Sequence, residues 1–431
     1  MDELRINISD TDEGPEGGYV EAAGEEEAGS TMNMEELLKQ MLDLGASDIF
    51  IVAGLPMTYE ADGKQYRQSG NPMMPADTEG IVRSIYSLAR RDIGPFLESH
   101  NHDDDFSFAV PGVGRFRVNV FRQRGSLGAI IRVIPFTLPT PEEFNIPPEV
   151  MRCSDFQKGL VLVTGPAGAG KSTTLACIID KLNHERVGHI ITMEDPIEYV
   201  HRHDNCIVTQ REIPTDVATY AEALRSAMRE SPDIMLLGEM RDQETIGTAV
   251  TAAEMAQLLF STLHTTGAAN TIDRIIDAFP ANQQRQIRFQ LSMVLQAVVS
   301  QQLVPTIDGE QVPAFEIMIT NTAIRNLIRE EKTHQMDSVI AASGAEGMRT
   351  MDQSLFDLVA SGRVAPEVAL QRAIHQEALA KRLEKANLMG GVPAGNAGGA
   401  NVAPASDVAA SDAVADSAAE KAAVSDAVDG E

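Results

Sequence analysis

The residues with the clearest chemical potential form one continuous stretch near the middle of the chain. They read Gly165-Pro166-Ala167-Gly168-Ala169-Gly170-Lys171-Ser172 and fit the pattern G-x-x-x-x-G-K-[ST], which binds nucleotide phosphates. Glycines let consecutive backbone N–H groups turn toward a phosphate, and Lys171 can reach the β- and γ-phosphates. Ser172 then offers a hydroxyl ligand to Mg²⁺, and Thr173 completes the predicted binding set.

The segments on either side of this loop supply the elements that such a site needs. Residues 159–164 are a short apolar run that predicts a buried strand, and residues 173–182 have apolar residues at helical spacing. A helix that starts directly after the loop adds the partial positive charge of its N-terminus to the phosphate site. This context favours a phosphate-binding loop over a chance glycine-rich turn.

Acidic residues follow the next predicted strand, residues 189–193. They are three carboxylates in five residues: Glu194, Asp195 and Glu198. In an open α/β sheet the ligand lies beyond the carboxyl ends of the strands, so these side chains are placed to hold Mg²⁺ or to orient the attacking water. A polar loop without a catalytic role is the alternative.

Two more predicted strands end in residues of the same kind of chemistry. Residues 233–237 lead into Gly238 and Glu239: Gly238 replaces the usual aspartate, which leaves Glu239 as the only acid there. Residues 258–263 lead into His264, which can sense the γ-phosphate by hydrogen bonding, although a lone histidine is as often structural. A helix is predicted before each strand, over residues 220–229 and 245–257.

The part of the chain before the loop reads as a smaller α/β domain. It has a predicted helix over residues 35–42, a helical region over 78–97 broken at Gly94-Pro95, and strands over 47–52, 105–110, 114–121 and 129–135. Four arginines cluster on these strands: Arg115, Arg117, Arg122 and Arg132. One explanation of this cluster is a solvated face of the sheet. The alternative is that some of these arginines neutralise phosphate charge. Prolines over 139–148 mark a linker.

After the predicted strand over residues 258–263 the sequence predicts mostly helices. We expect them over residues 283–302, 323–329, 351–360 and 366–386. The resulting division is a disordered acidic tail (1–32), an N-terminal α/β domain (33–137), a linker (138–150), an ATPase domain with C-terminal helices (151–388) and a low-complexity tail (389–431).

Charge and composition exclude several classes of protein. The chain has 431 residues and a net charge of −28, more than half of it at the two ends, which argues against general nucleic-acid binding. The three cysteines form no C-x-x-C pair, which argues against a structural zinc site and favours a reducing compartment. No apolar run approaches the roughly 18 residues of a membrane span, and the acidic start is unlike a signal peptide, so we predict a cytoplasmic protein without a transmembrane segment.

Taken together, these motifs resemble those of the secretion-type ATPases, and among them the PilT-like retraction ATPases of type IV pili. The phosphate loop, the acidic box at 191–201, the glycine-containing strand at 234–242, the histidine box at 261–266 and the helical motif at 323–330 match in order. The similarity spans about residues 33–385. Ala256-Gln257 and Ser231 depart from common family residues. The absence of C-x-x-C separates the chain from the zinc-containing extension and type II secretion branches.

The resemblance implies a P-loop RecA-like ATPase domain and a smaller PAS-like N-terminal domain. It implies a homohexamer that binds ATP and Mg²⁺ between subunits, with Ser172 and Glu239 as metal ligands. The resemblance implies that Glu239 is the acid that follows the strand over 233–237 and holds Mg²⁺ or orients water, that Glu198 is the general base and that His264 is the phosphate sensor. Arg117 and Arg132 are implied to approach the phosphates.

The function expected from this resemblance is a cytoplasmic motor that hydrolyses ATP, acts on an inner-membrane pilus platform protein and powers pilus retraction. Two alternatives remain open. One is a non-hydrolysing accessory ring that modulates a partner motor, and the other is a secretion ATPase with another cargo. A small-molecule kinase is disfavoured because no acceptor pocket is recognisable.

Overall fold

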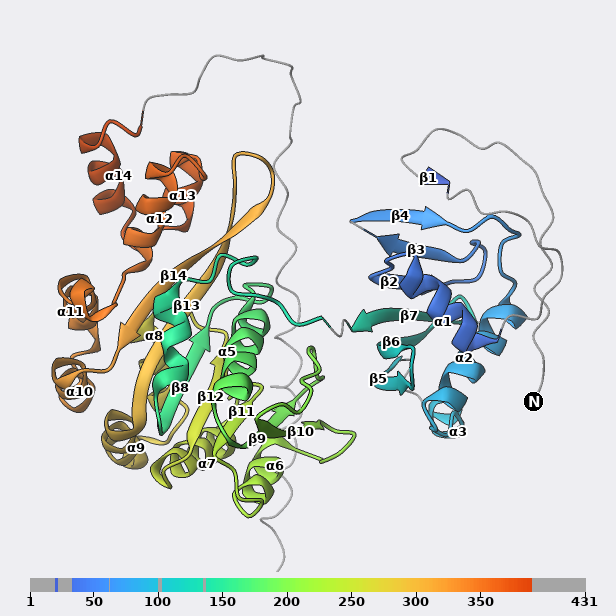
Figure 1. The fold of residues 1–431 in the computed structure, drawn as a ribbon, viewed down its shortest axis with the longest axis horizontal. Helices are drawn as coiled ribbons and strands as arrows, with labels where there is room; N and C mark the ends of the chain where they lie inside the picture. Colours follow the sequence, from blue (N-terminus) through green and yellow to red (C-terminus); the bar gives the residue numbers. More distant parts are fainter. Residues whose placement is uncertain (1–19, 22–32, 62, 100–102, 135–136, 390–431) are drawn as a thin grey trace, which may run out of the picture. The chain divides into compact units, whose positions relative to one another are not determined.

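The structure, a computed structural model, describes residues 20–21, 33–61, 63–99, 103–134 and 137–389 (Figure 1). Most of the predicted acidic tail and nearly all of the predicted low-complexity tail lie outside these residues. Within the described ranges, no helix is long and apolar enough to cross a membrane. The described chain contains two sheets of seven strands each, so the predicted α/β class is confirmed.

The first sheet is antiparallel except for its edge strand β1, which pairs in parallel with β4. Its strands, in spatial order, are β1 (Val20–Glu21), β4 (Lys64–Arg67), β3 (Thr58–Ala61), β2 (Asp48–Ile51), β7 (Ser126–Ile134), β6 (Gly114–Gln123) and β5 (Asp103–Val110). Three helices accompany it: α1 (Met34–Asp43), α2 (Pro75–Leu88) and α3 (Gly94–Glu98). The helical break lies earlier than predicted, because α2 already ends at Leu88. Gly94 and Pro95 are the first two residues of α3, a position where the missing N–H of proline is tolerated.

Local sequence explains how this first sheet is covered. Asn33 caps α1 with its side chain, which accepts a hydrogen bond from the Glu35 N–H, and Leu38 and Met41 point into the core. In β6 the residues Phe116, Val118 and Val120 are fully buried on the helix-covered face. The alternating positions, among them Arg117, therefore lie on the opposite face.

The second sheet is parallel except for its last strand, β14, which is antiparallel to β13. Its strands, in spatial order, are β10 (Cys206–Glu212), β9 (Gly188–Glu194), β11 (Ile234–Leu237), β12 (Leu258–Leu263), β8 (Gly159–Thr164), β13 (Leu295–Pro305) and β14 (Gln311–Ile319). The α-helices of this part are α4 (Pro148–Met151), α5 (Lys171–Glu185), α6 (Tyr220–Ala227), α7 (Gln243–Glu254), α8 (Ala268–Asp277), α9 (Ala281–Val294), α10 (Thr322–Arg329), α11 (Met336–Ala342), α12 (Met351–Ala360), α13 (Pro366–Arg372) and α14 (Gln376–Lys385).

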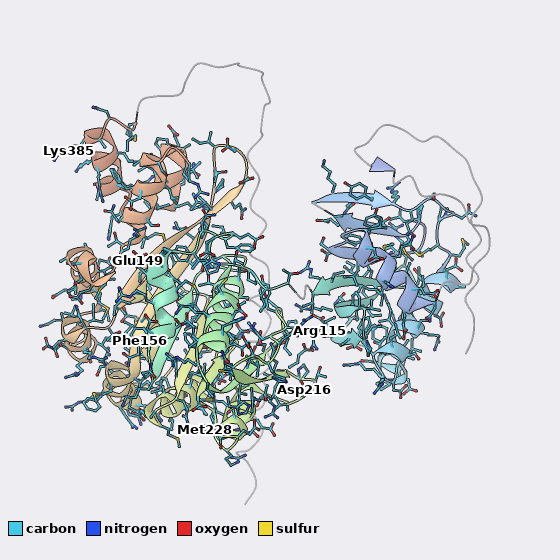
Figure 2. The ribbon with its side chains drawn as sticks, viewed as in Figure 1. Arg115, Glu149, Phe156, Asp216, Met228 and Lys385 are labelled. Carbon is cyan, nitrogen blue, oxygen red and sulfur yellow. The ribbon has the colours of Figure 1, made fainter. Side chains whose placement is uncertain are left out.

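Helices cover both faces of this sheet, so its central strands β11, β12 and β8 are buried along their whole length. In β8, Leu160 and Leu162 pack with α6 to α11 on one face, whereas Val161 and Val163 pack with α4 and α5 on the other. Phe156, which follows a short 3-10 helix after α4, packs against the second of these cores (Figure 2). The C-terminal helices α12 to α14 form a separate core with the ends of β13 and β14.

One predicted helix is wrong over part of its length. The sequence prediction continued a helix from residue 283 to 302, but α9 ends at Val294 and the chain continues directly as β13. No glycine or proline separates the two elements, so the boundary has no local signal. The strand forms because Val298 and Val299 are buried on opposite faces of the sheet, between β8 and β14.

Helix α10, predicted from the motif at 323–330, holds the end of α9. The Arg325 guanidinium donates hydrogen bonds to the carbonyl oxygens of Ser292 (2.7 Å) and Met293 (2.9 Å), and Arg329 donates to the Ser292 hydroxyl at 3.1 Å. Carbonyl groups in the last turn of a helix have no partner within it, and arginine is well suited to satisfy them. The motif therefore fixes the junction between α9 and β13.

Arg325→Ala is expected to lower the free energy of unfolding by about 1–2 kcal/mol, because charged hydrogen bonds to the last α9 carbonyls are lost. Urea unfolding followed by circular dichroism measures the change. Asn326→Ala, at an exposed position of the same helix, is the matched control and should change stability by less than about 0.5 kcal/mol. Equal effects of the two substitutions would contradict the capping role.

Candidate functional site

The predicted phosphate loop joins β8 to α5, and its backbone depends on glycine. Gly165, Gly168 and Gly170 have φ values of +144°, +73° and +84°, a region that other residues rarely adopt. At Gly165 an added Cβ would also lie 2.1 Å from the carbonyl oxygen of Gln301. Residues 166–168 are exposed, so this part of the loop is open to a ligand.

Lys171 is the first residue of α5 and lies folded over the loop. Its side chain is buried, and its ammonium donates hydrogen bonds of 2.9 Å to the carbonyl oxygens of Gly165 and Pro166. Burial lowers the pKa of Lys171, and the carboxylates of Glu198 and Glu239 act against this shift. The lysine charge is therefore held between the loop and the two predicted catalytic acids.

The two glutamates of the acidic box have different environments. Glu194, at the end of β9, accepts hydrogen bonds from the Thr192 hydroxyl (2.6 Å) and the Gln210 amide (3.4 Å), and burial raises its pKa to about 7. Glu198 is exposed and borders the cavity described below. Glu194 also borders this cavity but is held by these hydrogen bonds, whereas Glu198 is exposed there.

The surroundings of Gly238, directly after β11, explain why glycine stands at this position. A Cβ there would lie 2.7 Å from the Tyr220 hydroxyl and 3.2 Å from the Met193 carbonyl oxygen, so an aspartate does not fit. The Gly238 carbonyl oxygen accepts a hydrogen bond of 2.6 Å from the Thr262 hydroxyl on β12. Glu239 follows in a nearly buried position.

Glu239 has two cationic or potentially cationic neighbours. Its carboxylate pairs with Arg241 at 2.5 Å, and the Nε2 atom of His264 lies 3.5 Å from its other oxygen. His264 itself is exposed at the end of β12. Because β11 and β12 are neighbouring parallel strands, the second acid and the histidine meet at one edge of the sheet.

A cavity of about 560 Å³ brings the predicted groups together. It is bordered by the loop residues from Ala167 to Thr173 and by the predicted catalytic residues Glu198, Glu239 and His264. The two predicted arginines belong to the first sheet and have carboxylate partners there. Arg117 pairs with Asp105 at 2.5 Å, and Arg132 pairs with Asp48 at 2.8 Å.

Several residues at this cavity were not among the predicted site residues. Among them are Glu194, Asp195, Tyr199, His201, Tyr220, Arg241 and Thr262. Tyr199 shares a 3.0 Å hydrogen bond with the Thr173 hydroxyl, and burial lowers the pKa of His201 to about 4, which keeps it neutral. Tyr199 and His201 lie at the end of the acidic box (191–201), so the polar residues of that box were the signal in the sequence that could have identified them. Tyr220 had none, because its role depends on contact with Gly238.

The donor groups at this cavity fit Mg²⁺ bound together with a nucleotide. Among the described residues, no group of three or more histidines, cysteines or carboxylates is placed to hold a metal alone. Mg²⁺ is usually held by one or two protein oxygens and completed by water and phosphate. The Ser172 hydroxyl and the Glu239 carboxylate supply oxygen donors of this kind.

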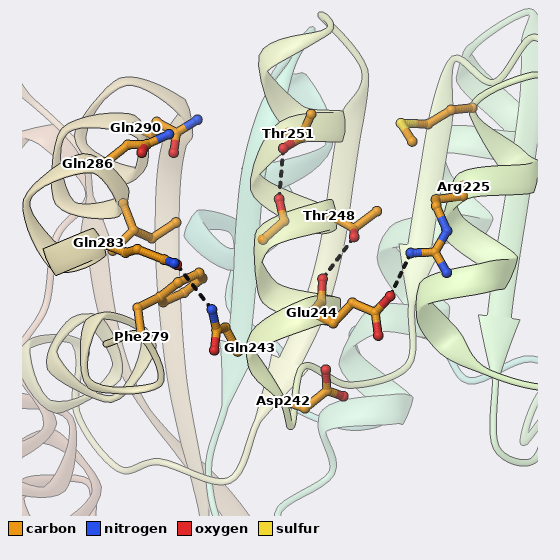
Figure 3. Close-up of a pocket in the computed structure, with 13 residues that line it drawn as sticks. Arg225, Asp242, Gln243, Glu244, Thr248, Thr251, Phe279, Gln283, Gln286 and Gln290 are labelled. Atoms are coloured by element: carbon orange, nitrogen blue, oxygen red, sulfur yellow. Dashed lines mark hydrogen bonds and ion pairs between the residues drawn. The ribbon is translucent and has the colours of Figure 1, made fainter. Parts of the chain in front are cut away.

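A larger cavity, of about 820 Å³, lies between α6, α7 and α9 (Figure 3). Its polar side chains already pair with each other: Arg225 with Glu244 at 2.7 Å, and Gln243 with Gln283 at 3.1 Å. It contains neither loop amides nor unpaired acids at strand ends. Size alone would select this cavity, but the chemistry favours the smaller one.

Comparison with known proteins identifies the family. Residues 148–386 match the family model described as type II/IV secretion system protein. The chain belongs to this family. Along most of its length this secretion-family chain is similar to the type IV pilus retraction ATPase PilT of Pseudomonas aeruginosa, with 49% identity over 79% of this chain and 98% of that protein. The type IV pilus ATPase PilU of the same organism is 38% identical over 79% of this chain and 89% of PilU.

Solved structures of the secretion family agree with these matches. The crystal structure of the pilus retraction motor PilT with bound ADP matches with a TM-score of 0.74 and 44% identity, over 81% of this chain and 99% of that chain. The DotB ATPase of Legionella pneumophila matches with a TM-score of 0.64 and 28% identity, over 78% and 94%. The predicted resemblance to PilT-like ATPases is confirmed.

Glu194→Gln is expected to change how stability depends on pH. Burial raises the folded-state pKa of Glu194 from its ordinary value of 4.5 to about 7, so the unfolded chain loses this proton at lower pH than the folded chain does. The parent therefore loses stability as pH rises through this window, and a neutral glutamine does not. Thermal melts from about pH 5 to pH 8 should show the midpoint of the variant rising relative to the parent. Parallel profiles would contradict the raised pKa.

Proposed function

We propose that this chain is a hexameric motor that hydrolyses Mg-ATP and powers type IV pilus retraction. The observation that carries the proposal is the meeting of Lys171, Glu198, Glu239 and His264 at one cavity beside the phosphate loop. Similarity to the retraction ATPase PilT along nearly all of that protein supports the choice of cargo.

The proposed reaction needs mainly positioning and charge neutralisation, because phosphoryl transfer asks for little covalent chemistry from the protein. The loop N–H groups and Lys171 bind the phosphates, and Ser172 and Glu239 hold Mg²⁺. Mg²⁺ neutralises phosphate charge when it is bound with the nucleotide. Glu198 takes a proton from the attacking water, and His264 hydrogen-bonds on the γ-phosphate side.

Arg117 and Arg132 of the N-terminal domain neutralise the phosphate charge in the closed state of the proposed ring. Each must first leave its carboxylate partner, Asp105 or Asp48. The Arg117–Asp105 pair is exposed and contributes roughly 0–1 kcal/mol, so a triphosphate can replace Asp105 at little cost. Asp48 is mostly buried, so Arg132 leaves its partner at a higher cost. Closure and release of the N-terminal domain about the linker would then transmit work.

The proposed location follows from the proposed role. We place the protein in the cytoplasm, at the inner-membrane platform protein of the pilus, on which the ring would act. Nucleic acid is not a proposed partner, because the chain carries a net charge of −28.

Lys171→Ala and Glu239→Ala should each lower Mg²⁺-dependent ATP hydrolysis at least about 100-fold, because phosphate binding and water positioning are lost. Phosphate release is the measurement, with light scattering in parallel. Both variants should retain a hexameric mass. A parent that binds nucleotide as a hexamer without hydrolysis would favour the accessory ring, and hydrolysis that is normal in Lys171→Ala would refute the site.

The choice of general base separates the two glutamates of the acidic box. Glu198→Gln should lower kcat about 100-fold or more, because the group that accepts the water proton is removed. Glu194→Gln is the matched control: it keeps hydrogen-bonding capacity within the box and should retain most of kcat. If Glu194→Gln is the more damaged variant, the base has been assigned to the wrong residue.

A further inference from the structure

The strand that the sequence prediction missed, β13, runs parallel to β8 and in register with it where β8 enters the phosphate loop. Ser300 lies opposite Thr164, the last residue of β8. The next residue on β13, Gln301, therefore stands beside Gly165, the first residue of the loop. Its side chain is buried, with an exposed fraction of only 3%.

Gln301 contacts the loop at three points. Its carbonyl oxygen lies 2.1 Å from the position that a Cβ would take at Gly165, and its Nε2 atom lies 2.8 Å from the corresponding position at Gly170. Its Oε1 atom accepts a 2.7 Å hydrogen bond from the Thr174 hydroxyl in the first turn of α5. One residue of β13 thus touches both ends of the loop and the helix behind it.

We propose that Gln301 is a positioning residue of the phosphate loop, an inference that rests on the proposed nucleotide site. Its amide joins Thr174 to the central sheet by a hydrogen bond and packs beside Gly170, and so it holds the loop N–H groups and Lys171 in the phosphate-binding geometry before nucleotide arrives. A loop that is already ordered loses less conformational freedom on binding, so the tie raises nucleotide affinity.

The geometry distinguishes this role from direct contact with the ligand. Gln301 does not border the 560 Å³ cavity, although Leu303, two residues further along β13, does. The Gln301 Oε1 atom is directed to Thr174 and its carbonyl oxygen to Gly165. The residue acts through the loop.

The same strand also holds the loop that follows the histidine. The Ser300 hydroxyl accepts a 2.9 Å hydrogen bond from the Gly267 N–H, and Glu316 on β14 accepts one of 2.7 Å from the Ala268 N–H. Ser300 and Gln301 are neighbours in sequence. They therefore fix the phosphate loop and the His264 loop to one rigid strand, which sets the spacing between the two sides of the cavity.

Gln301→Leu should weaken binding of a fluorescent ADP analogue about tenfold, because the hydrogen bond to Thr174 is lost and a branched apolar group replaces the amide beside Gly170. Thr174→Val should have a similar effect, and the double variant should add little to either single one. Thr174→Ser, which keeps the hydroxyl, should recover most of the affinity. In hydrolysis assays KM should rise more than kcat falls.

Gln302→Leu is the matched control, because Gln302 is also buried but donates to the Arg372 carbonyl oxygen, away from the loop. It should lower the thermal midpoint and keep nucleotide affinity. Parent-like affinity in folded Gln301→Leu and Thr174→Val would overturn the inference. If Gln301→Leu does not fold, the comparison of Thr174→Val with Thr174→Ser still decides. Unchanged binding in Lys171→Ala would instead overturn the nucleotide site itself.

Discussion

The close approach of two backbones, at Gly165 and Gln301, is the constraint on which the rest of the site depends. No side chain fits between them, so the first residue of the phosphate loop must be glycine whatever ligand is bound. The approach exists because β8 and β13 are parallel neighbours in register up to Thr164 and Ser300. The six loop residues from Gly165 to Gly170 connect this contact to α5, so they fix the position of Lys171 at the start of the helix.

The cavity has more acidic than basic groups near the phosphate loop, and the structure gives each carboxylate a different environment. Burial raises the pKa of Glu194 to about 7, which lowers its negative charge near neutral pH. Glu239 is neutralised by Arg241 and lies close to His264. Glu198 and Asp195 are exposed at the cavity, so the proposed site can accept a polyphosphate beside Lys171 while carboxylates stay available to water.

Local patterns sufficed for the phosphate loop, the acids at strand ends and the histidine, because each follows a short apolar run directly. They failed where tertiary packing decides. The α9–β13 boundary has no breaker residue, and Gln301 was hidden inside a predicted helix. The hairpin strands β3 and β4 and the edge strand β14 were missed as well. Gly238 was noticed as a departure, but its cause, the Tyr220 hydroxyl, lies 18 residues earlier in the chain and is visible only in three dimensions.

Arg241 and the arginines of the first sheet can be compared by how easily each can change its carboxylate partner. Arg241 pairs with a carboxylate that is almost buried, and removing it would leave the charge of Glu239 uncompensated, which is costly. Arg117 pairs with a carboxylate at the surface of its own sheet, Asp105, where solvent already weakens the attraction, whereas Asp48, the partner of Arg132, is nearly as buried as Glu239. A polyphosphate offers more charge and more acceptor oxygens than one carboxylate, so Arg117 can exchange partners readily. The proposed motor therefore needs no new charged groups for closure: Arg241 keeps Glu239 in place, and Arg117 is held by a pair weak enough to open.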